Sequence, residues 1–172
     1  MQSCFRIKRC RLASPLVTRL GEAVIALSLG ASSFGQCEID ELFPLDGQRD
    51  DKVGWDSAIS GNVAILGAPW DDDKGPDSGA AYFYRYNPNV DQWLVDAKIL
   101  ETDGTPHNEF GLSVGVDGSR AIIASPFFQA TLHGVVYIYQ YDPATKTWSE
   151  EALLTASSSM SSAPPWLLTA TL

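Results

Sequence analysis

After residue 35 the chain alternates short apolar runs with turn signals, and no segment shows a helical period. Apolar residues alternate with small or polar ones over residues 112–116. A two-residue hairpin signal follows at Asp117-Gly118, and the next apolar run, 121–124, stops at Pro126. Proline ends such a run because it cannot donate a hydrogen bond to a neighbouring strand. This pattern predicts β-strands throughout.

The same order of signals occurs 57 residues earlier, so the chain contains a repeat. The pairs at this offset are Asp46/Asp103, Gly54/Gly111, Gly61/Gly118, Ile65/Ile122 and Pro69/Pro126. Beyond Pro126 the offset shortens to 55, and the pairs are Gly79/Gly134, Tyr82/Tyr137 and Trp93/Trp148. The missing residues fall within one loop, where a repeat tolerates a change of length.

Each repeat predicts four strands, at about 55–60, 62–67, 79–86 and 92–100, and at about 111–116, 120–125, 134–141 and 147–154. Four strands in 55–57 residues is the spacing of a propeller blade. A β-sandwich also uses short strands, but its strands need not recur at a fixed offset. We therefore expect an all-β fold of propeller-type blades, with two four-stranded repeats at about 41–97 and 98–152.

Two further segments resemble part of a repeat. Residues 41–43 match 98–100, which predicts a stray N-terminal strand, and residues 153–157 begin the same pattern a third time. Propellers use a terminal strand in this way to close the ring. Two blades and one extra strand fall short of the 4–8 blades that typically make a ring. The sequence therefore predicts an incomplete propeller with open edges, and such edges favour self-association.

Residues 1–35 differ in character from the rest. They begin with five cations and continue with the apolar run 23–31, and Ser33 and Gly35 supply small residues at the end. This layout predicts a secretory signal peptide and export to the periplasm, the cell surface or the medium. The apolar run is shorter than the ~20 residues that a membrane-spanning helix needs. The alternative is a buried N-terminal helix.

The charge of the chain restricts its partners. The formal net charge is -9, and residues 1–35 hold five of the 12 Lys and Arg but one of the 21 Asp and Glu, so the remainder carries -13. A surface this acidic repels nucleic acid and anionic membranes. Cys37 is the single cysteine after residue 35, so an internal disulfide is excluded there. It is either a lone strand residue or the site of an intermolecular bridge.

The repeat resembles the FG-GAP repeat of integrin-α-like β-propellers, and it is most similar to the bacterial secreted type. Phe110-Gly111 supplies the first half of that motif and Gly67-Ala68-Pro69 the second. The first repeat has Val53-Gly54 for the first half, and the second has Ala124-Ser125-Pro126 for the second half. The glycine permits a backbone turn closed to other residues, and the phenylalanine is expected to pack between blades. The resemblance implies a non-catalytic propeller that serves binding or cell adhesion.

One acidic loop, residues 71–77, is a candidate calcium site. Calcium takes six to eight hard oxygen ligands, and alternating aspartates near a glycine can supply several. We expect Asp71, Asp73 and Asp77 as ligands, with Asp72 pointing outward. The alternative is a solvated acidic loop without metal. In integrin-type propellers calcium lies between the motif halves, where this chain has only short turns at 60–62 and 117–119, so that site does not carry over.

No catalytic constellation emerges from the residue types. His107 and His133 are the only histidines, and they fall in different loops without a nucleophile motif nearby. There is no glycine-rich phosphate loop and no pair of histidines at metal-ligand spacing. We therefore expect no enzymatic activity and no cofactor other than calcium.

The repeat is lost after Ser157, where residues 158–172 are rich in serine and proline. Reading one base out of frame permits Asp-Glu-Phe-Gly at the register where a third repeat requires Phe-Gly. We interpret residues 158–172 as the product of a frameshift that truncates a longer array. The alternative is a genuine disordered tail.

The predicted function is a secreted binding, adhesion or scaffold protein, a fragment of a longer propeller that contacts an extracellular protein or a glycan through loops. An accessory propeller portion of a secreted hydrolase and a non-functional truncated product are the alternatives.

Overall fold

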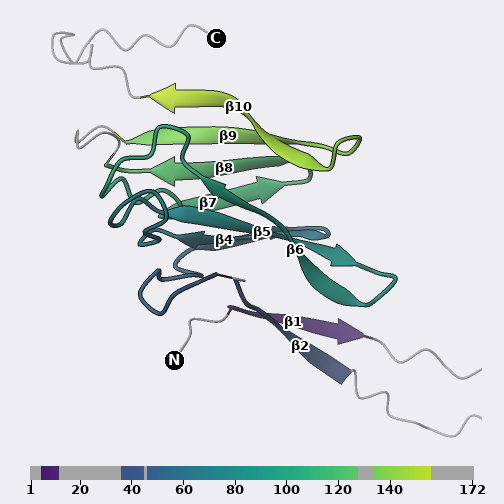
Figure 1. Ribbon diagram of the computed structural model, residues 1–172. Helices are drawn as coiled ribbons and strands as arrows, with labels where there is room; N and C mark the ends of the chain where they lie inside the picture. The colour runs from purple at the N-terminus through teal and green to yellow at the C-terminus, as the bar shows by residue number, and fades with distance from the viewer. Residues whose placement is uncertain (1–4, 12–35, 45, 128–133, 156–172) are drawn as a thin grey trace, which may run out of the picture.

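The computed structural model describes residues 5–11, 36–44, 46–127 and 134–155, with side chains from residue 41 onward. All elements in these ranges are strands (Figure 1). Blade one consists of β3 (Ser57–Ser60), β4 (Val63–Ala68), β5 (Ala80–Asn87) and β6 (Gln92–Leu100), in that order across the sheet. Blade two consists of β7 (Ser113–Asp117), β8 (Arg120–Ser125), β9 (Val135–Asp142) and β10 (Thr147–Thr155).

The predicted strands are confirmed, with boundaries that shift by up to two residues. All neighbours in both sheets are antiparallel. Each blade also carries an irregularity between its third and fourth strands, between Phe83 and Tyr84 in blade one and between Glu150 and Ala152 in blade two. The two sheets form no closed ring, so the fold is that of incomplete propeller blades.

The N-terminal part of the chain forms a separate hairpin-like pair. β1 (Phe5–Arg11) pairs antiparallel with β2 (Gln36–Leu42) and joins neither blade sheet. β2 is the stray strand expected from the sequence, and Leu42 at its end is buried against blade one. Residues 12–35 lie outside the described ranges, so the signal peptide stays a prediction.

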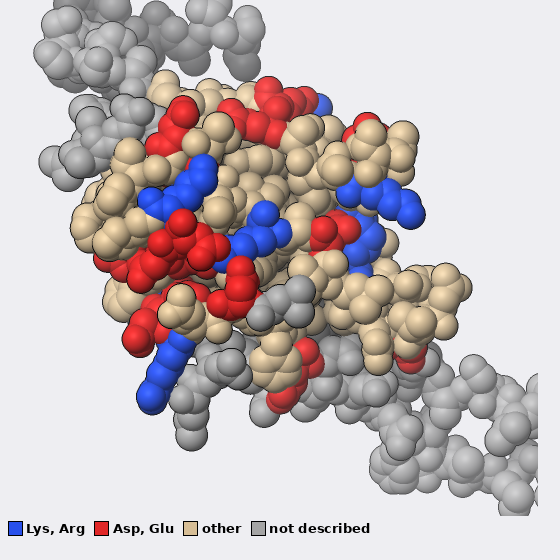
Figure 2. Space-filling model, in the orientation of Figure 1, with Lys and Arg blue, Asp and Glu red and all other residues tan. Residues whose placement is uncertain are grey.

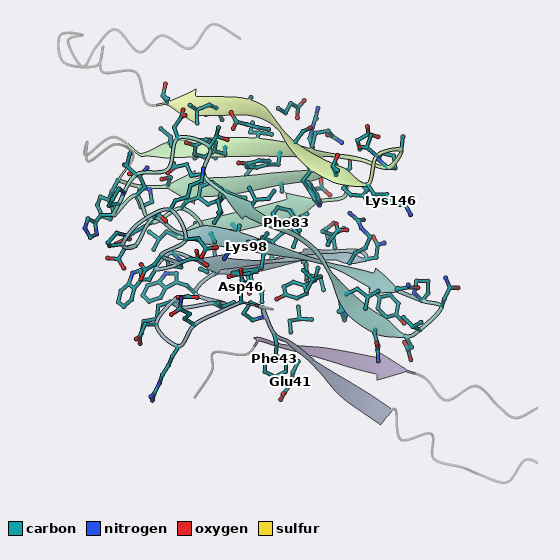
Figure 3. The ribbon with its side chains drawn as sticks, in the orientation of Figure 1. Glu41, Phe43, Asp46, Phe83, Lys98 and Lys146 are labelled. Atoms are coloured by element: carbon teal, nitrogen blue, oxygen red, sulfur yellow. The ribbon has the colours of Figure 1, made fainter. Side chains whose placement is uncertain are left out.

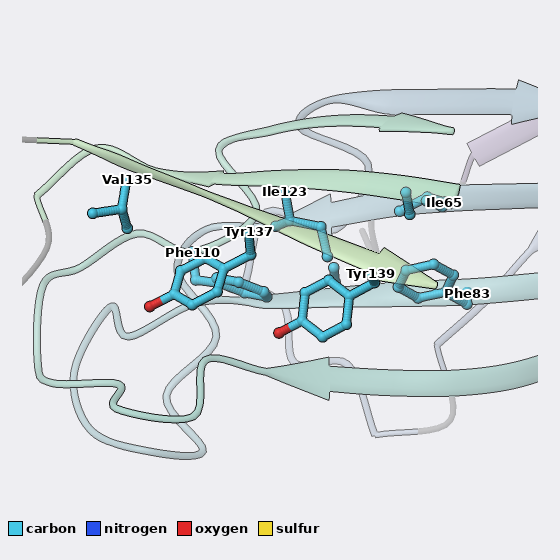
Figure 4. Packing of buried hydrophobic residues seen from close by; sticks show 9 residues of the cluster. Ile65, Phe83, Phe110, Ile123, Val135, Tyr137 and Tyr139 are labelled. Atoms are coloured by element: carbon cyan, nitrogen blue, oxygen red, sulfur yellow. The ribbon is translucent and has the colours of Figure 1, made fainter. Parts of the chain in front are cut away.

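A shared hydrophobic core joins the two blades (Figure 4). Blade one contributes Ile65, Ala81 and Phe83, while Phe110 comes from the loop between the blades. Blade two contributes Ala121, Ile123, Val135, Tyr137 and Tyr139. The Phe110 ring lies edge-on to the Tyr137 ring, with 5.4 Å between the ring centroids. Phe83 packs against Trp148, with 4.6 Å between their centroids. The expectation that Phe110 packs between the blades is therefore confirmed.

The two intact halves of the motif meet at this interface. A Cβ added to Gly67 would lie 1.9 Å from the carbonyl oxygen of Gly111, so only glycine allows the two chains to approach this closely. Gly111 itself has φ +89 and donates its N–H to the Ala124 oxygen at 3.0 Å. Gly54, its repeat counterpart, has φ +82 and donates to the Gly67 oxygen at 2.9 Å. Both repeats therefore contain the same contact, in which a glycine with positive φ donates its N–H to a carbonyl oxygen of the second strand.

Polar contacts also hold the blades together. The Asp56 carboxylate accepts from the Val114 N–H and the Ser113 hydroxyl, both at 2.9 Å. At the other end of the sheets, the Trp148 indole N–H donates to Asp96 at 3.0 Å. Because these contacts join groups more than 50 residues apart, they fix the register of one blade against the other.

The two blades differ in how their outer faces are covered. Every residue of β4 is buried, because one face of blade one packs on blade two and the other packs on Leu42 and Val53. In β8 buried and exposed residues alternate. We call the side of blade two that no described segment covers its open face. Strand pairing places on it Gly115, Ile122, Ala124, Val136, Ile138, Ala152 and Leu154.

Candidate functional site

The long loops of both blades lie at one end of the molecule. The segments 43–56, 69–79 and 101–112, which we call the loop end, connect to the starts of β3, β5 and β7, while tight hairpin turns occupy the opposite end (Figure 1). Acidic side chains gather over this end, on the left of the view in Figure 2. The blades therefore act as a rigid support for loops that carry charge.

At the centre of the loop end, Lys98 is surrounded by three carboxylates (Figure 3). Its ammonium lies 2.6 Å from Asp73 and 2.9 Å from both Asp46 and Asp71. Asp71 is buried, whereas Asp46 and Asp73 are about half exposed, so this acidic cluster extends from the interior to the solvent. A buried carboxylate requires such a partner, since an unpaired buried charge is costly.

The cluster shifts the pKa values of its members. Burial disfavours the ammonium of Lys98, but its hydrogen bonds to the carboxylates outweigh burial and raise its pKa. Burial opposes the charged form of Asp46 as well, yet hydrogen bonds from Lys98 and Tyr82 lower its pKa. The Tyr82 hydroxyl lies within donating distance of Asp71 at 2.9 Å and of Asp46 at 3.0 Å. Burial and the Asp71 charge raise the pKa of Tyr82 despite Lys98.

The three expected calcium ligands do not converge on one point. Asp71 and Asp73 hold the ammonium of Lys98, while Asp77 lies apart and approaches His107 Nδ1 at 3.1 Å. Among the described side chains, no three acidic, histidine or cysteine groups are placed to hold a metal ion. As they lie, these residues do not fit a calcium cage. Calcium binding stays a prediction that requires Lys98 to move.

Blade two uses a different buried network at the equivalent tyrosine. The Tyr137 hydroxyl donates to Glu101 Oε1 at 2.8 Å, and the Asn108 amide donates to the other oxygen of the same carboxylate. Glu101 and Asn108 are both buried. Burial and the Glu101 contact raise the pKa of Tyr137. In both blades, the first tyrosine of the third strand therefore donates its hydroxyl to a carboxylate from the loop that precedes the blade. This carboxylate is Asp46 in blade one and Glu101 in blade two.

Two stacked tryptophans form an exposed aromatic surface at the loop end. The Trp55 and Trp70 rings are stacked, with centroids 6.3 Å apart and an interplanar angle of 27°. Trp55 is 57% exposed and Trp70 is 38% exposed. The Lys52 ammonium lies 4.8 Å from the centre of the Trp70 ring. Flat aromatic faces with polar neighbours are suited to recognition, because they offer contact area at a low cost in side-chain entropy.

The backbone beneath this tryptophan pair is held in place by Asp51. Its carboxylate accepts from the Gln48 N–H at 2.6 Å, and its carbonyl accepts from the Trp70 N–H at 3.3 Å. The next residue, Lys52, has φ +56, and its carbonyl accepts from the Trp55 N–H at 2.9 Å. Burial and the charge of Asp71 raise the pKa of Asp51. The rings therefore project from a fixed turn.

Several of these groups were not recognised from the sequence. Lys98 lies in a strand, and the equivalent residue of the second repeat is Leu153. A charged residue where the other repeat has a leucine was the sequence signal that Lys98 has a partner of opposite charge. The stacking of Trp55 on Trp70 was not predicted from the sequence either. His107 is exposed and pairs with Asp77, while His133 and Phe128 lie outside the described residues.

Comparisons with known proteins agree with the repeat. Residues 38–84 match the family model of the FG-GAP repeat. This range holds Gly67-Ala68-Pro69, the strands β3 and β4, and the first part of β5. No curated protein matches the chain. The match shows that the chain contains an FG-GAP repeat, and the second blade has the same strand order as the first.

Proposed function

We propose that this chain is a secreted, non-catalytic binding or scaffold protein that contacts an extracellular protein or a glycan through its loop end. The observation that carries the proposal is the stacked, exposed pair Trp55 and Trp70 beside the acidic cluster of Lys98. FG-GAP repeats form propeller-like binding domains, so a loop surface is the expected place for a partner.

The chemistry of the surface favours a glycan over other partners. Two indole faces can stack on the apolar faces of sugar rings, and the half-exposed carboxylate of Asp73 can accept hydrogen bonds from sugar hydroxyls. The acidic surface disfavours phosphorylated or sulfated ligands, since like charges repel. A neutral oligosaccharide is thus the ligand class that fits best.

The experiment is a binding assay of the full chain on an array of neutral and acidic oligosaccharides. The repeat offers a matched control, because Trp55 and Trp70 correspond to Leu112 and Phe127 in the second repeat. We expect binding to neutral glycans that is lost in the double variant Trp55→Ala/Trp70→Ala and kept in Leu112→Ala/Phe127→Ala. Absence of binding to every glycan, or equal loss in both variants, rejects the glycan surface. Release of reducing sugar from a bound glycan contradicts a non-catalytic role.

Export and truncation are separate parts of the proposal. Cleavage after residue 35 is tested by N-terminal sequencing of the exported protein, which should begin near Gln36. Truncation is tested by reading the gene beyond codon 150 in all three frames. Further Phe-Gly and Gly-Ala-Pro signals at the repeat spacing support a longer array, whereas stop codons in the shifted frame contradict it.

A further inference from the structure

We propose that the ammonium of Lys98 takes the place of a metal ion at the loop end, so that the loop carrying Trp70 is held in position without calcium. Loop 71–77 is the segment where calcium was expected from the sequence, and there strand β6 of the same chain supplies the cation. The proposal deepens the proposed function and rests on it for the role of the tryptophan surface. The identity of the cation is tested without any ligand.

The carboxylates surround the ammonium of Lys98 as they would surround a bound cation (Figure 3). Its Nζ lies 2.6 Å from Oδ2 of Asp73 and 2.9 Å from Oδ2 of both Asp46 and Asp71. An ammonium has three donors, which matches the three carboxylates around it. Asp46 precedes blade one, whereas Asp71 and Asp73 follow β4. One cation therefore joins two loops to a strand, which is the structural role of a metal ion in a loop-rich site.

Burial explains why this position needs a permanent cation. The Asp71 side chain is 2% exposed, and a carboxylate buried without a cation is costly. Burial disfavours the ammonium of Lys98, but hydrogen bonds to Asp73, Asp46 and Asp71 outweigh burial and raise its pKa. The ammonium therefore stays charged well above neutral pH. Because Lys98 is part of the chain, its presence does not depend on the metal content of the medium.

The two repeats show that the lysine and the acidic loop occur together. Lys98 pairs with Tyr82 across the sheet, and Leu153 pairs with Tyr137 in the same way in blade two. The stretch 127–131, which stands in the second repeat where the first has its acidic loop, contains no Asp or Glu. The repeat without the acids thus also lacks the lysine. The lysine therefore belongs to the acidic loop and not to the strand pattern that both blades share.

The same cluster fixes the loop that carries Trp70. Asp71 follows Trp70 directly, and its carbonyl oxygen accepts from the Gly79 N–H at 2.9 Å and from the Ser78 hydroxyl at 3.1 Å. The backbone of Asp71 thus closes loop 71–79, while its buried carboxylate binds Lys98. Lys98 is therefore a positioning residue for Trp70, which it orients through Asp71 without contacting a ligand itself.

The test is a calorimetric titration of the full chain with calcium alone, compared with Lys98→Met and Lys52→Met. Lys52 is the matched control, because its ammonium contacts the Trp70 ring of the same loop. We expect no calcium binding by the unaltered chain or by Lys52→Met. Lys98→Met should bind calcium at about 10⁻⁴–10⁻³ M, the range of extracellular modules, because its carboxylates are then free to bind a metal ion. Adding Asp73→Ala to Lys98→Met should abolish this binding.

Circular dichroism in EDTA verifies that each variant is folded. If Lys98→Met is unfolded in EDTA, calcium should restore its folded spectrum, since the metal ion then replaces the ammonium. Calcium binding by the unaltered chain that Asp73→Ala removes overturns the proposal. A folded Lys98→Met that binds no calcium also overturns it, and so does an unfolded one that calcium fails to restore.

The role of the tryptophan surface is measured separately, with the neutral glycans of the array in EDTA and in calcium. The unaltered chain should bind equally in both, whereas Lys98→Met should bind more weakly in EDTA and recover in calcium. This recovery distinguishes positioning by a cation from a general loss of stability. Glycan binding by the unaltered chain that EDTA abolishes overturns the proposal. Absence of glycan binding by every protein rejects the proposed function, while the calcium titration still decides the role of Lys98.

Discussion

Blades one and two have nearly the same sequence pattern and strand order, yet their surroundings differ. The central strand β4 of blade one is buried on both faces, and its counterpart β8 alternates between buried and exposed residues. Both strands are short apolar runs, with Ile65 at the position of Ile122. The difference teaches that a repeat sequence encodes two apolar faces per blade, and that neighbours decide which faces are covered.

The motif halves show the same contrast. The Phe110 position carries an aromatic ring because it packs between two blades, whereas Val53 at the equivalent position in repeat one fills a smaller space beside Leu42. Gly67 permits a close backbone approach from blade two, and no described segment approaches its counterpart Ala124 in that way. The departures from the motif therefore lie at positions that do not face a second described blade.

The largest expected effect is at the shared core. Phe110→Ala should lower the free energy of unfolding by about 3–5 kcal/mol, because it removes a fully buried ring and leaves a cavity between the blades. Val53→Ala, at the matching position, removes a smaller side chain and should cost less. Urea denaturation of both variants measures the difference. Equal losses of unfolding free energy in the two variants would show that the side chain at the first motif position contributes equally to stability in both repeats.

The second test compares the equivalent isoleucines. Ile65→Ala should cost about 2–5 kcal/mol, since the side chain is fully buried. Ile122→Ala should cost well under half of that in the monomer, because its side chain is half exposed. Unfolding is monitored by circular dichroism at low protein concentration, so that association does not contribute. A loss at Ile122 as large as at Ile65 would mean that another part of the same chain covers the open face.

The third test removes the cation of the acidic cluster. Lys98→Met should lower the free energy of unfolding by about 2–3 kcal/mol, because Asp71 is then buried without its cationic partner. Lys52→Met, which loses a cation–π contact at the exposed Trp70, should cost about 1 kcal/mol or less. Thermal and urea unfolding measure both. An unchanged free energy of unfolding in Lys98→Met would show that the cluster adds nothing to the stability of blade one.

The fourth test uses pH to weigh the polar contact between the blades. Burial disfavours the charged form of Asp56, but hydrogen bonds from Val114, Ser113 and Ser57 outweigh it and lower its pKa below 3.8. A lowered pKa in the folded state stabilises the protein above pH 3.8, and this contribution is lost as the pH falls through the folded pKa.

Asp56→Asn should therefore cost about 1 kcal/mol near neutral pH and progressively less in acid. The measurement is urea unfolding of both proteins from pH 7 to pH 3. A constant difference over this range would contradict a role for the ionised carboxylate. Asp46, whose pKa is also lowered, titrates in both proteins and cancels in the comparison.

The smallest expected effect concerns calcium at residues 71–77. With Lys98 in place, we expect calcium to change the melting temperature of the chain by less than about 2 °C, since an ammonium already occupies the carboxylates. In Lys98→Met calcium should raise the melting temperature by roughly 2–4 °C, and adding Asp73→Ala should abolish the rise. A clear rise in the unaltered chain that Asp73→Ala removes would establish a calcium site in spite of Lys98.

Much of the fold followed from local patterns in the sequence. The turn signals and apolar runs placed all eight blade strands within two residues, because strand periodicity and hairpin chemistry are local properties. The repeat offset paired Gly54 with Gly111 and Tyr82 with Tyr137, and these pairs do play matching roles. Phe110 was correctly expected between the blades, since the resemblance and its aromatic side chain agreed.

The candidate site was predicted less completely, since its parts come together only in space. Asp71 and Asp73 were recognised as an acidic run, but Lys98, 25 residues after Asp73, determines what they hold. The Trp55–Trp70 pair likewise joins the start of β3 to the loop after β4.

The sequence by itself determined the strands, the repeat and two apolar faces for each blade, because these depend on residue types and short-range periodicity. Only the tertiary structure decided that the described segments cover blade one on both sides and blade two on one. It also decided that the ammonium of Lys98 lies among the carboxylates of the acidic loop. The physical reason is that burial and ion pairing depend on which distant segments meet, and a strand carries the same pattern whether or not a neighbour covers it.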